Sequence, residues 1–457
     1  MEADAMTGKA MLERFVEANP LAVMSRAIIG GMLNEEAFDR VFDENRSRQY
    51  HQSIRFSSLA VSMADIAVGA VKNRNQAYRK HRDEVRASAE AYYTKLNRTE
   101  PAVSEAVVDY SAEKATQWLQ QLGFEPWEVL PGYHVFSLDG NHLQKTEKRL
   151  KETRGLCAAP LPGTIVARFN HQTSLFDRAY LIEDAHAQEA TVLNRVLEDW
   201  AEHDLVIADR HFCVVAFLAG IAARKGCFVI RQHGRLQGEL LGKRRHIGRT
   251  STGTAYEQSM RICQKDCDLV VRRITIELDQ PTRDGDTEIH ILSNLPAEDA
   301  DGCQISEMYR QRWEIENAFY ILTTTLVCEM KSNCHPRCAL FLFCMAMLAY
   351  NCRQVLLAAL YSEHAEEDVN QMSHYQMSID TVCPMGGLLI AISDDEWERL
   401  VPSSPREQVS FLRSVSRHVD VRDYRKSVRG PKMKKPKRKR CKAGTHVSAA
   451  KLLSQRK

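Results

Sequence analysis

Two aspartates lie where a sheet could bring them together. Asp139 follows the apolar run Tyr133–Leu138, and Asp209 follows the apolar run Asp204–Ala208. Both runs have the length and residue types of buried β-strands. In open α/β sheets, ligands bind outside the carboxyl ends of the strands. The two carboxylates are therefore predicted to meet at one edge of a sheet, where a third carboxylate on a helix, Glu316, could join them.

Three carboxylates in one pocket predict a particular chemistry. Oxygen-only ligand sets suit Mg²⁺ or Mn²⁺ better than zinc. Without cations the three negative charges would repel one another and raise each other's pKa. Two divalent ions about 3.5–4 Å apart relieve that repulsion and form the clamp used for in-line phosphoryl transfer. We therefore predict that Asp139, Asp209 and Glu316 bind two Mg²⁺ or Mn²⁺ ions and act as the catalytic residues.

The third carboxylate belongs to the stretch Met308–Tyr320, which has helical periodicity. At 100° per residue, Tyr309, Arg312 and Glu316 fall in one narrow sector, beside an apolar stripe. An arginine there could bind phosphate, because its planar fork matches phosphate oxygens. The alternative is an exposed i, i+4 ion pair between Arg312 and Glu316, worth roughly 0.3–0.5 kcal/mol. Trp313 on the same stretch is interpreted as a core or edge aromatic.

Each aspartate also has a purely structural interpretation. Asp139-Gly140 is a turn dipeptide, and Asp209 could cap a following helix. Arg210 could reach phosphate, or could pair with Asp204 or Glu202. The joint strand, strand and helix arrangement favours the metal site over these alternatives. His142 and His211 flank the aspartates, but two-metal sites of this type do not require a histidine.

The elements around these residues alternate between strands and helices, which indicates an α/β fold. Further strands are predicted at 164–169, 174–182 and 227–231, and helices at 189–202 and 213–224. From 232 to 296 the pattern becomes β-rich, with strands predicted at 270–278 and 287–292. This insertion carries the basic cluster Lys243, Arg244 and Arg245, which we predict to bind DNA. It contains no tryptophan, so any base stacking there would fall to Tyr256, His233 or His246.

Charge is distributed very unevenly along the 457 residues. Between Arg422 and Lys457 there are fifteen lysines and arginines and one acidic residue, so this end carries +14. The whole chain carries +3, which leaves −11 for the rest. Such a tail suits a polyanion, either nucleic acid or an anionic membrane surface, although a solvated charged segment is the alternative. We predict DNA contacts for its residues Lys434, Lys435, Lys437 and Arg438.

The chain is long enough for several domains. We predict an N-terminal helical DNA-binding region at 1–130, in which basic and aromatic residues alternate between Lys72 and Tyr93. The other predicted segments are a first core segment at 131–231, the β-rich insertion at 232–296, a second core segment with the glutamate helix at 297–361, a C-terminal helical region at 362–428 and a basic, disordered tail at 429–457.

Composition narrows the cellular setting. Thirteen cysteines without an even framework favour reduced thiols. Neither Cys263–Cys267 nor Cys334–Cys338 has the spacing of a strong zinc motif. The acidic start Met1-Glu-Ala-Asp does not resemble a signal peptide. The apolar run 339–350 is too short to span a bilayer and is interpreted as a buried helix. We expect a cytoplasmic protein.

At this point the residues resemble a known family, the DDE transposases of bacterial insertion sequences. The resemblance rests on Tyr309-x2-Arg312-x3-Glu316, which is similar to the Tyr-x2-Arg-x3-Glu-x6-Lys branch. It also rests on the aspartate contexts 139–143 and 208–212, on His335-Pro336 and on Ala349-Tyr-Asn351. It runs from roughly Phe56 to Leu453.

The resemblance implies an RNase H-like catalytic core with the β-rich stretch inserted between the second aspartate and the glutamate. It also implies Mg²⁺-dependent nicking of element ends, transfer of the 3′-OH into target DNA, and synapsis of double-stranded ends by a homodimer. In this branch the tyrosine and arginine hold phosphate near the cleaved end. The chain departs from the motif at Thr323, where the family has lysine; Lys331 could substitute, two turns further on.

Two other functions remain open from the sequence. A structure-selective nuclease would use the same metal pair for hydrolysis alone. A DNA-binding repressor of transposition would no longer cut, and Thr323 makes that thinkable, although all three carboxylates are present.

Overall fold

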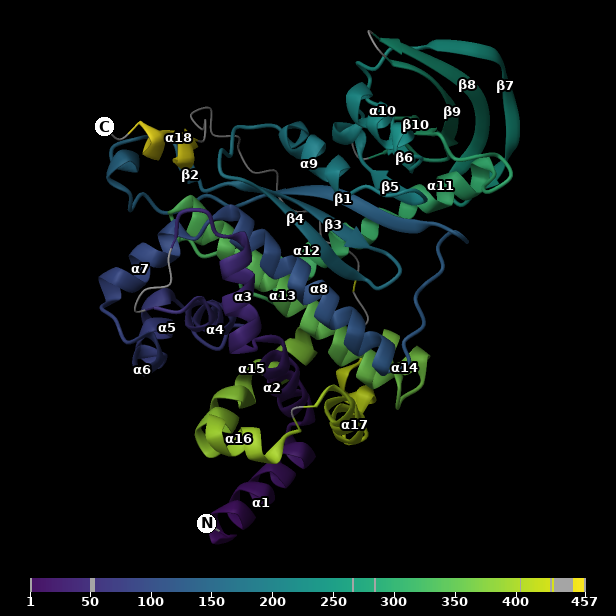
Figure 1. Cartoon of the computed structure of the whole chain (residues 1–457). Coiled ribbons are helices and arrows are strands. Elements are labelled where there is room, and N and C mark those ends of the chain that lie inside the picture. The colour runs from purple at the N-terminus through teal and green to yellow at the C-terminus, as the bar shows by residue number, and fades with distance from the viewer. Residues whose placement is uncertain are drawn as a thin grey trace.

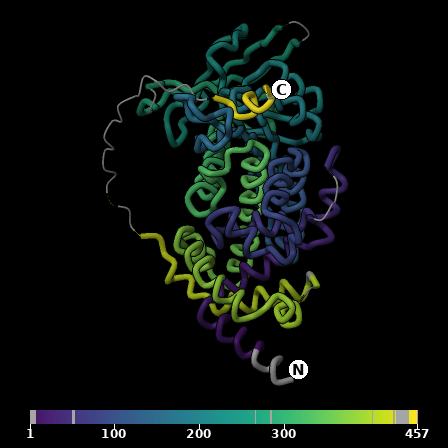
Figure 2. The backbone as a smooth tube through the Cα atoms, turned by 90° about the vertical axis from the view of Figure 1, so that its left-hand side faces the viewer, coloured from purple at the N-terminus to yellow at the C-terminus, as the bar shows by residue number. Residues whose placement is uncertain are grey.

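The computed structural model describes residues 2–49, 54–264, 267–282, 285–402, 404–427, 430 and 447–455. A β-rich half lies against a helical half (Figure 1). Turned by 90°, the long buried helices stand directly beneath the sheet, and the N-terminal helices (purple) lie with the yellow-green helices of residues 374–416 at the far side of them (Figure 2). The C-terminal end returns to the sheet side. The Lys434, Lys435, Lys437 and Arg438 predictions lie outside the described residues.

One nine-stranded sheet organises the β-rich half, with strand order β4-β3-β1-β5-β6-β10-β9-β8-β7. Its first five strands in chain order form the core part: β1 (His134–His142), β3 (Thr164–Asn170), β4 (Leu175–Ile182), β5 (Asp204–Ala208) and β6 (Cys227–Arg231). β3 pairs antiparallel with β1 and β4, whereas β1, β5 and β6 are parallel. These five strands confirm the five predicted from apolar runs, and the mixed sheet with its helices confirms the α/β class.

The insertion extends the same sheet instead of forming a separate one. It consists of β7 (Glu239–Thr250), β8 (Gly253–Gln264), β9 (Cys267–Leu278) and β10 (Glu288–Ser293), which pair antiparallel in sequence, and β10 joins β6. β9 and β10 match the two strands predicted there. β7 and β8 were not predicted, because their polar stretches, including the basic cluster, do not alternate with apolar residues.

Helices cover both faces of the sheet. On one face, α9 (Leu193–Glu198) and α10 (Val215–Ala223) pack on side chains such as Phe136, Leu138, Val206 and Ala208. On the other face, α11 (Gly302–Gln311) packs on Val135, Leu205 and Ile207, and α12 (Trp313–Thr324) continues toward β1. The predicted helix at 189–202 is instead a 3₁₀ turn, η2 (Glu189–Val192), followed by the short α9.

The helical half is built around α13 (Pro336–Tyr361), which is buried along most of its length and packs on α8. By length and composition α13 could cross a membrane, but 83% of its apolar window is buried inside the protein. This confirms the interpretation of residues 339–350 as a buried helix. Around α13 lie the N-terminal helices α1 (Glu2–Ala18), α2 (Pro20–Met32), α3 (Glu35–Asn45), α4 (Phe56–Ala67), α5 (Arg74–Lys80), α6 (Arg82–Val85), α7 (Ala89–Arg98) and α8 (Pro101–Gln121).

The C-terminal part adds further helices and returns to the β-rich half. Its elements are α14 (Glu366–Asn370), α15 (His374–Ala391), α16 (Asp394–Leu400), α17 (Pro405–Ser416) and η4 (Val421–Tyr424), then β11 (Val447–Ser448) and α18 (Ala449–Ser454). β11 pairs with β2 (Pro160–Leu161) beyond η1 (Lys151–Thr153), and Lys451 forms an ion pair with Asp184 at 3.0 Å. The prediction of a disordered tail is therefore wrong for residues 447–455, where parallel pairing with the distant β2 and a serine cap at Ser448 order the chain.

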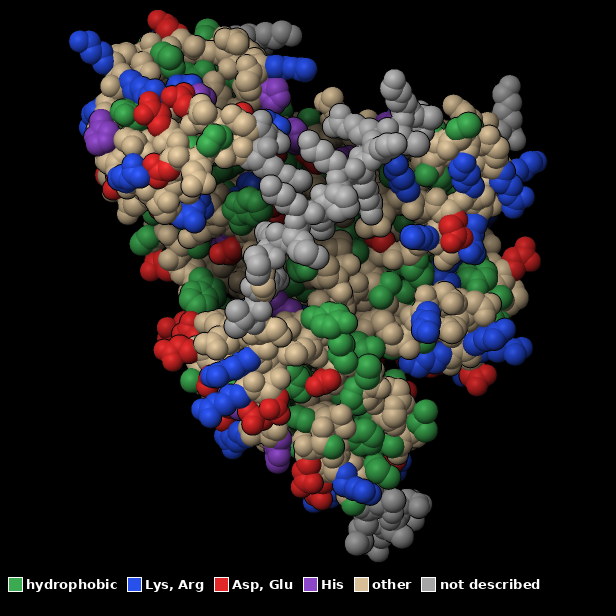
Figure 3. Space-filling model, turned by 180° about the vertical axis from the view of Figure 1, so that it is seen from behind, with side chains coloured by type: hydrophobic (Ala, Val, Ile, Leu, Met, Phe, Trp, Pro, Cys, Tyr) green, Lys and Arg blue, Asp and Glu red, His purple; other side chains and the backbone are tan. Residues whose placement is uncertain are grey.

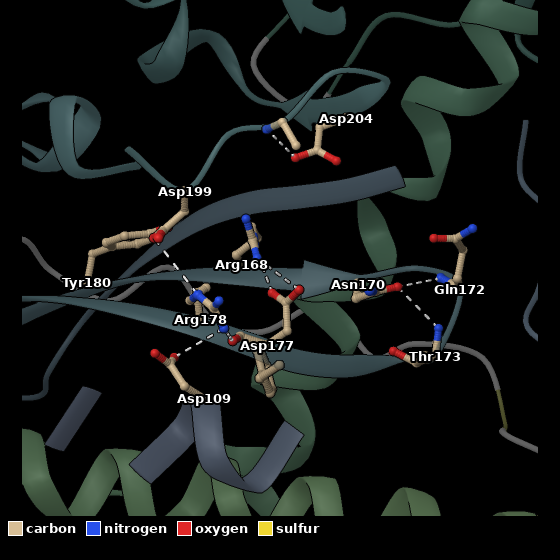
Figure 4. Close-up of polar contacts among 12 residues, drawn as sticks. Asp109, Arg168, Asn170, Gln172, Thr173, Asp177, Arg178, Tyr180, Asp199 and Asp204 are labelled. Atoms are coloured by element: carbon tan, nitrogen blue, oxygen red, sulfur yellow. Dashed lines mark hydrogen bonds and ion pairs between the residues drawn. The ribbon is translucent and has the colours of Figure 1, made fainter. Parts of the chain in front are cut away.

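A polar network ties α8 to the sheet (Figure 4). Arg168 on β3 forms a two-pronged ion pair with Asp177 on β4, at 2.9 and 3.2 Å. Next to it, Arg178 lies 3.6 Å from Asp109 of α8 and 3.9 Å from Asp199. Burial raises the pKa of Asp109 to about 7, and Arg178 only partly opposes the rise.

This raised pKa predicts how stability depends on pH. The pKa of Asp109 is about 7 in the folded protein and near 3.8 in the unfolded chain. Between about pH 4 and pH 7 the carboxyl is therefore protonated in the folded protein but ionised in the unfolded chain. Stability is therefore expected to fall as pH rises from about 4 to 7. Asp109→Asn should flatten that slope and stabilise the protein at pH 8 by on the order of 1 kcal/mol, since the side chain is 37% exposed and partly screened. Urea unfolding at pH 5 and pH 8 measures both, and an unchanged slope contradicts the assignment.

Candidate active site

The sheet places Asp139 and Asp209 side by side. Leu138 of β1 pairs in parallel register with Ala208 of β5, so the two aspartates are the next residues along neighbouring strands. Neighbouring strands lie about 4.8 Å apart. Alternation along each strand puts both aspartates on the face of Val135, Leu205 and Ile207, which is the face covered by α11. The prediction that the fold brings these two residues together is confirmed.

The local structure around Asp139 differs from the prediction. β1 does not end at Leu138 but continues to His142, because β3 pairs with β1 along its other edge as far as the His142–Thr164 pair. Asp139 is therefore inside a strand, and the turn interpretation of Asp139-Gly140 is wrong. What ends at this level is only the pairing with β5.

Asp209 does serve as a cap. Its Oδ1 accepts a hydrogen bond from the backbone N–H of His211 at 2.7 Å, at the start of the 3₁₀ turn η3 (Arg210–Phe212). Its other oxygen lies 3.5 Å from Nδ1 of His211. Asp209 thus caps η3 and not the following helix α10, whose N-cap is Val214. This cap holds the carboxylate at the strand end with both oxygens facing His211.

The helix that carries Glu316 is divided at Arg312. α11 ends at Gln311 and α12 begins at Trp313, with Arg312 between them in a helical conformation (φ −50°, ψ −28°). The single helix predicted over 308–320 is therefore two consecutive helices. The i, i+4 relation survives, because Arg312 Nη1 lies 2.5 Å from Glu316 Oε1.

Arg312 links the helix to the aspartates. Its side chain is only 14% exposed, so the predicted alternative of an exposed pair is wrong. Burial raises the pKa of Asp139 to about 7; the Arg312 charge opposes this rise, while the charges of Asp209 and Glu316 add to it. These mutual effects place Asp139, Asp209, Glu316 and Arg312 in one electrostatic neighbourhood, which we call the acidic site. Arg312 Nε is buried and has no hydrogen-bond acceptor among the residues that the structure describes.

The donor set of the acidic site fits a hard divalent cation. It consists of carboxylate oxygens, the ligands that Mg²⁺ and Mn²⁺ prefer, and its repulsion is visible in the raised pKa of Asp139. Within the described residues, no group of three or more His, Cys, Asp or Glu side chains is arranged closely enough to hold an ion. Here the Arg312 guanidinium provides the positive charge beside Glu316.

A fourth carboxylate, Glu189 of η2, borders the acidic site and had no signal in the sequence. Its oxygen lies against Gly140, where any Cβ would collide with it. Burial raises the pKa of Glu189, His211 lowers it and Asp209 raises it further. A side chain at position 140 would therefore displace the flexible carboxylate end of Glu189, so Gly140 marks the close approach of Glu189 and not a turn.

Tyr309 and its neighbours flank the acidic site on α11. The Arg312 guanidinium lies 5.9 Å from the Tyr309 ring centre and 5.7 Å from that of Trp313. Trp313 is 59% exposed, so of its two predicted placements the core is wrong and the edge remains. Thr323 donates its hydroxyl to the backbone oxygen of Phe319 at 3.0 Å, inside its own helix. A pocket of about 500 Å³ opens beside Tyr309 and Trp313, under the β7–β8 turn.

The predicted DNA-binding residues of the insertion are exposed but largely paired. Arg244 contacts Glu277 at 2.7 Å and lies 4.0 Å above the Tyr256 ring centre, and Arg245 contacts Glu257 at 3.1 Å. Lys243 is exposed on β7. Because Arg244 covers Tyr256, this ring is poorly placed for base stacking.

Arg210 is exposed in η3. Its two suggested partners bond elsewhere, since Asp204 accepts from the Ala201 N–H at 2.9 Å and Glu202 pairs with Lys225 at 3.2 Å. Whether Arg210 and the insertion residues contact DNA stays a prediction.

Comparison with known proteins identifies part of this architecture. Residues 164–352, from β3 into α13, match the family described as Transposase DDE domain. The chain carries a transposase DDE domain. The matched segment includes Asp209 and Glu316, and it begins after β1 and Asp139. No curated protein matches the chain. The DDE domain implies a transposase-type activity with DNA as partner, and domains of this family generally use divalent metal ions.

Proposed function

We propose that this protein is a DNA transposase that cuts insertion-sequence ends and joins the freed 3′-OH to target DNA. The observation that carries the proposal is the register of β1 and β5, which sets Asp139 beside Asp209 beneath the helices of Arg312 and Glu316. The DDE domain match over 164–352 gives the same class of activity.

The core strands support an RNase H-like catalytic core. Three antiparallel strands, β1, β3 and β4, come first in the chain, and β5 and β6 then add in parallel on the other side of β1. The β7–β10 insertion enters after the second aspartate and before Glu316. This strand order supports the RNase H-like core with an insertion that we propose.

The residues of the acidic site divide the work of phosphoryl transfer. Asp139, Asp209 and Glu316 would hold two Mg²⁺ or Mn²⁺ ions, which supply the electrostatic clamp for in-line displacement at phosphorus. Arg312 keeps a fixed positive charge beside them, and its buried Nε–H, which has no acceptor among the described residues, would donate to a phosphate oxygen. Tyr309 lies on the same side and would orient the DNA end.

The DNA would approach over a surface with several basic elements. Exposed lysines and arginines gather on the N-terminal helices α5 and α6, at the right-hand edge of Figure 3; they are Lys72, Arg79, Lys80, Arg82 and Arg86. Lys243 of β7, Arg210 and the basic tail would add further contacts. We propose a homodimer in the synaptic complex, acting on nucleoid DNA in the cytoplasm.

A two-plasmid assay tests this function. The first plasmid carries the host segment that contains this coding sequence with its flanking DNA, and the second is a target without it. With Mg²⁺, nicks should map to the segment's ends, and 3′ ends should become covalently joined to the target. Nicks without joining would favour a structure-selective nuclease, and end binding without nicks would favour a repressor; either result contradicts the proposal.

The salt dependence of DNA binding tests the tail. Each phosphate contact contributes a slope of about −0.9 to the logarithm of affinity against the logarithm of salt concentration. Replacing Lys434, Lys435, Lys437 and Arg438 by glutamine should make the slope shallower by about 3 to 4. These substitutions leave β11 and α18, which pack on the folded protein, in place. Equal slopes for the two proteins would remove the four residues from the DNA interface.

A further inference from the structure

We propose that Ser137, His171 and Glu314 form a clamp that fixes the rotation of α12 and thereby positions Glu316 beside Asp139. This inference rests on the proposed phosphoryl-transfer function. His171 Nδ1 lies 2.9 Å from Glu314 Oε2, and His171 Nε2 lies 2.7 Å from Ser137 Oγ. We call this set the Ser137–His171–Glu314 clamp.

The clamp joins three elements that are far apart in the chain. Ser137 is on β1, His171 follows β3, and Glu314 is in the first turn of α12. Ser137 and His171 are almost fully buried, at 0% and 2% exposure, whereas the Glu314 side chain is 48% exposed. A carboxylate can only accept, so the Nδ1–H of His171 donates to Glu314; with a neutral ring, the Ser137 hydroxyl then donates to Nε2. His171 also anchors its own backbone, since its N–H donates to the Val135 oxygen at 3.0 Å.

Both ends of the clamp are placed relative to the acidic site. Ser137 and Asp139 are two residues apart on β1 and so share one face of the strand. On α12, Ile315 is fully buried, and Glu314 and Glu316 lie 100° to either side of it. The helix therefore rests on a buried face that begins at Ile315 and continues through Ala318, Phe319 and Leu322, with the clamp on one flank and the acidic site on the other.

This geometry makes helix rotation the coordinate that the clamp controls. A helical side chain ends about 5–6 Å from the axis, so a 20° rotation would move the Glu316 carboxylate by roughly 2 Å. Misplacement of a reacting group by about 1 Å can cost on the order of 100-fold in rate. The buried apolar face of α12 makes non-directional contacts, whereas the hydrogen bond between Glu314 and the buried His171 restrains the rotation of the first turn in one direction.

A serine, a histidine and an acid also form the catalytic triad of serine hydrolases, but that role does not fit here. The Ser137 side chain has no exposed surface and its hydroxyl is engaged with His171 inside the sheet–helix interface. A nucleophile must reach its substrate at hydrogen-bond distance. The clamp is therefore assigned to positioning.

The test compares three substitutions on α12 in the full-length protein. Glu314→Ala removes the acceptor for His171, and Glu314→Gln keeps an acceptor oxygen while losing the charge. Asn317→Ala is the matched control, because Asn317 is exposed on the same helix. With saturating Mg²⁺ and end DNA, Glu314→Ala should lower the nicking rate on the order of 10- to 100-fold with DNA affinity within about twofold. Glu314→Gln should recover most of that loss.

A readout independent of cutting is hydrogen exchange of the amides of residues 313–324. Exchange should accelerate at least tenfold in Glu314→Ala and stay near the wild-type rate in Glu314→Gln and Asn317→Ala. Equal loss in the Ala and Gln variants would assign the effect to the charge of Glu314 and overturn the clamp. Unchanged exchange in Glu314→Ala would overturn it as well.

A double-substitution cycle separates the clamp from general loss of stability. The background is the double variant His171→Phe/Ser137→Ala. The phenylalanine keeps a ring against Phe169, since the ring centres of Phe169 and His171 are 5.5 Å apart, and the alanine removes the hydroxyl that would otherwise be buried without a partner. Adding Glu314→Ala to this background should slow nicking less than threefold further, because the contact between residues 171 and 314 is already broken. A full additional loss overturns the proposal. If the wild-type protein does not nick DNA, the proposed function itself is overturned. If the wild type nicks DNA and Glu314→Ala nicks at the same rate, only the clamp is overturned.

Discussion

Replacing Asp139, Asp209 or Glu316 by the matching amide is expected to lower Mg²⁺-dependent nicking by on the order of 10³-fold or more, with DNA binding within about twofold. The three carboxylates are the only proposed ligands of the metal pair, and metal electrostatics contribute several kcal/mol to such reactions. Amides keep the size of the side chain but are neutral and far weaker ligands. Nicking of labelled end DNA measures the first effect and gel shift in EDTA the second.

Thermal unfolding without metal distinguishes this result from damage to the fold. The carboxylates repel one another across a partly buried site, and burial with this repulsion raises the pKa of Asp139 to about 7. Asp139→Asn should therefore leave the melting temperature in EDTA equal or higher, whereas Glu316→Gln also removes the partner of the buried Arg312 and should lower it. Adding Mn²⁺ should stabilise the wild type more than each variant, because a ligand stabilises the state that binds it. Glu202→Gln, at the opposite end of β5 and paired with Lys225, serves as the control and should behave as wild type. If a variant nicks at a rate within tenfold of the wild type, the residue replaced in it is not catalytic.

The core strands were predictable because each is a short apolar run whose side chains are buried on both faces. Asp204–Ala208 is buried throughout, and a run of that kind has few alternatives to a central strand. β7 is the opposite case: it is an edge strand with most of its residues exposed. Its side chains are polar on both faces, so the period-2 signal is missing. The cross-strand acids that pair with Arg244 and Arg245 become visible only when the register is known.

The acidic site shows what local sequence could and could not predict. Asp139 and Asp209 were identified from the strand before each of them, and their meeting depends on the parallel register of β1 and β5. Asp139-Gly140 carries a turn signal that β3 overrides, since pairing along the far edge of β1 keeps the chain extended. That override comes from a strand more than twenty residues away. The break at Arg312 was also missed, because a single helical turn residue hardly changes a 100° pattern.

No sequence pattern indicated the residues that contact the acidic site or its helix without belonging to a motif. Glu189 and His171 occur in connecting segments, with no motif around them, and only the folded chain places them against Gly140 and Glu314. Thr323 illustrates the converse. It stands at a motif position, but in the structure it bonds to its own helix, so the role expected of a lysine there must pass to other basic residues.

Arg312→Ala is expected to reduce nicking by on the order of 100-fold or more, and Arg312→Lys should recover only part of it. Arg312 combines three features that a substitution to alanine removes together: the 2.5 Å contact to Glu316, the charge that opposes the rise in the Asp139 pKa, and a buried Nε–H without an acceptor among the described residues. Lysine restores the charge but not the planar fork, which is what matches phosphate oxygens. Arginines that stabilise transferring phosphates are worth 10³ to 10⁵ in other phosphoryl-transfer enzymes.

The control for this prediction is Arg310→Ala, two residues away. Arg310 is half-exposed and pairs with Glu307 at 2.8 Å, on the α11 side of the break. Its removal costs a surface ion pair, typically below 1 kcal/mol, and should change the nicking rate by less than threefold. If Arg312 served only to neutralise the carboxylates, Arg312→Lys would restore the wild-type rate and excess Mg²⁺ would rescue Arg312→Ala. A lysine variant that stays slow at saturating Mg²⁺ instead assigns Arg312 to the phosphate, because only the geometry of the donor then differs.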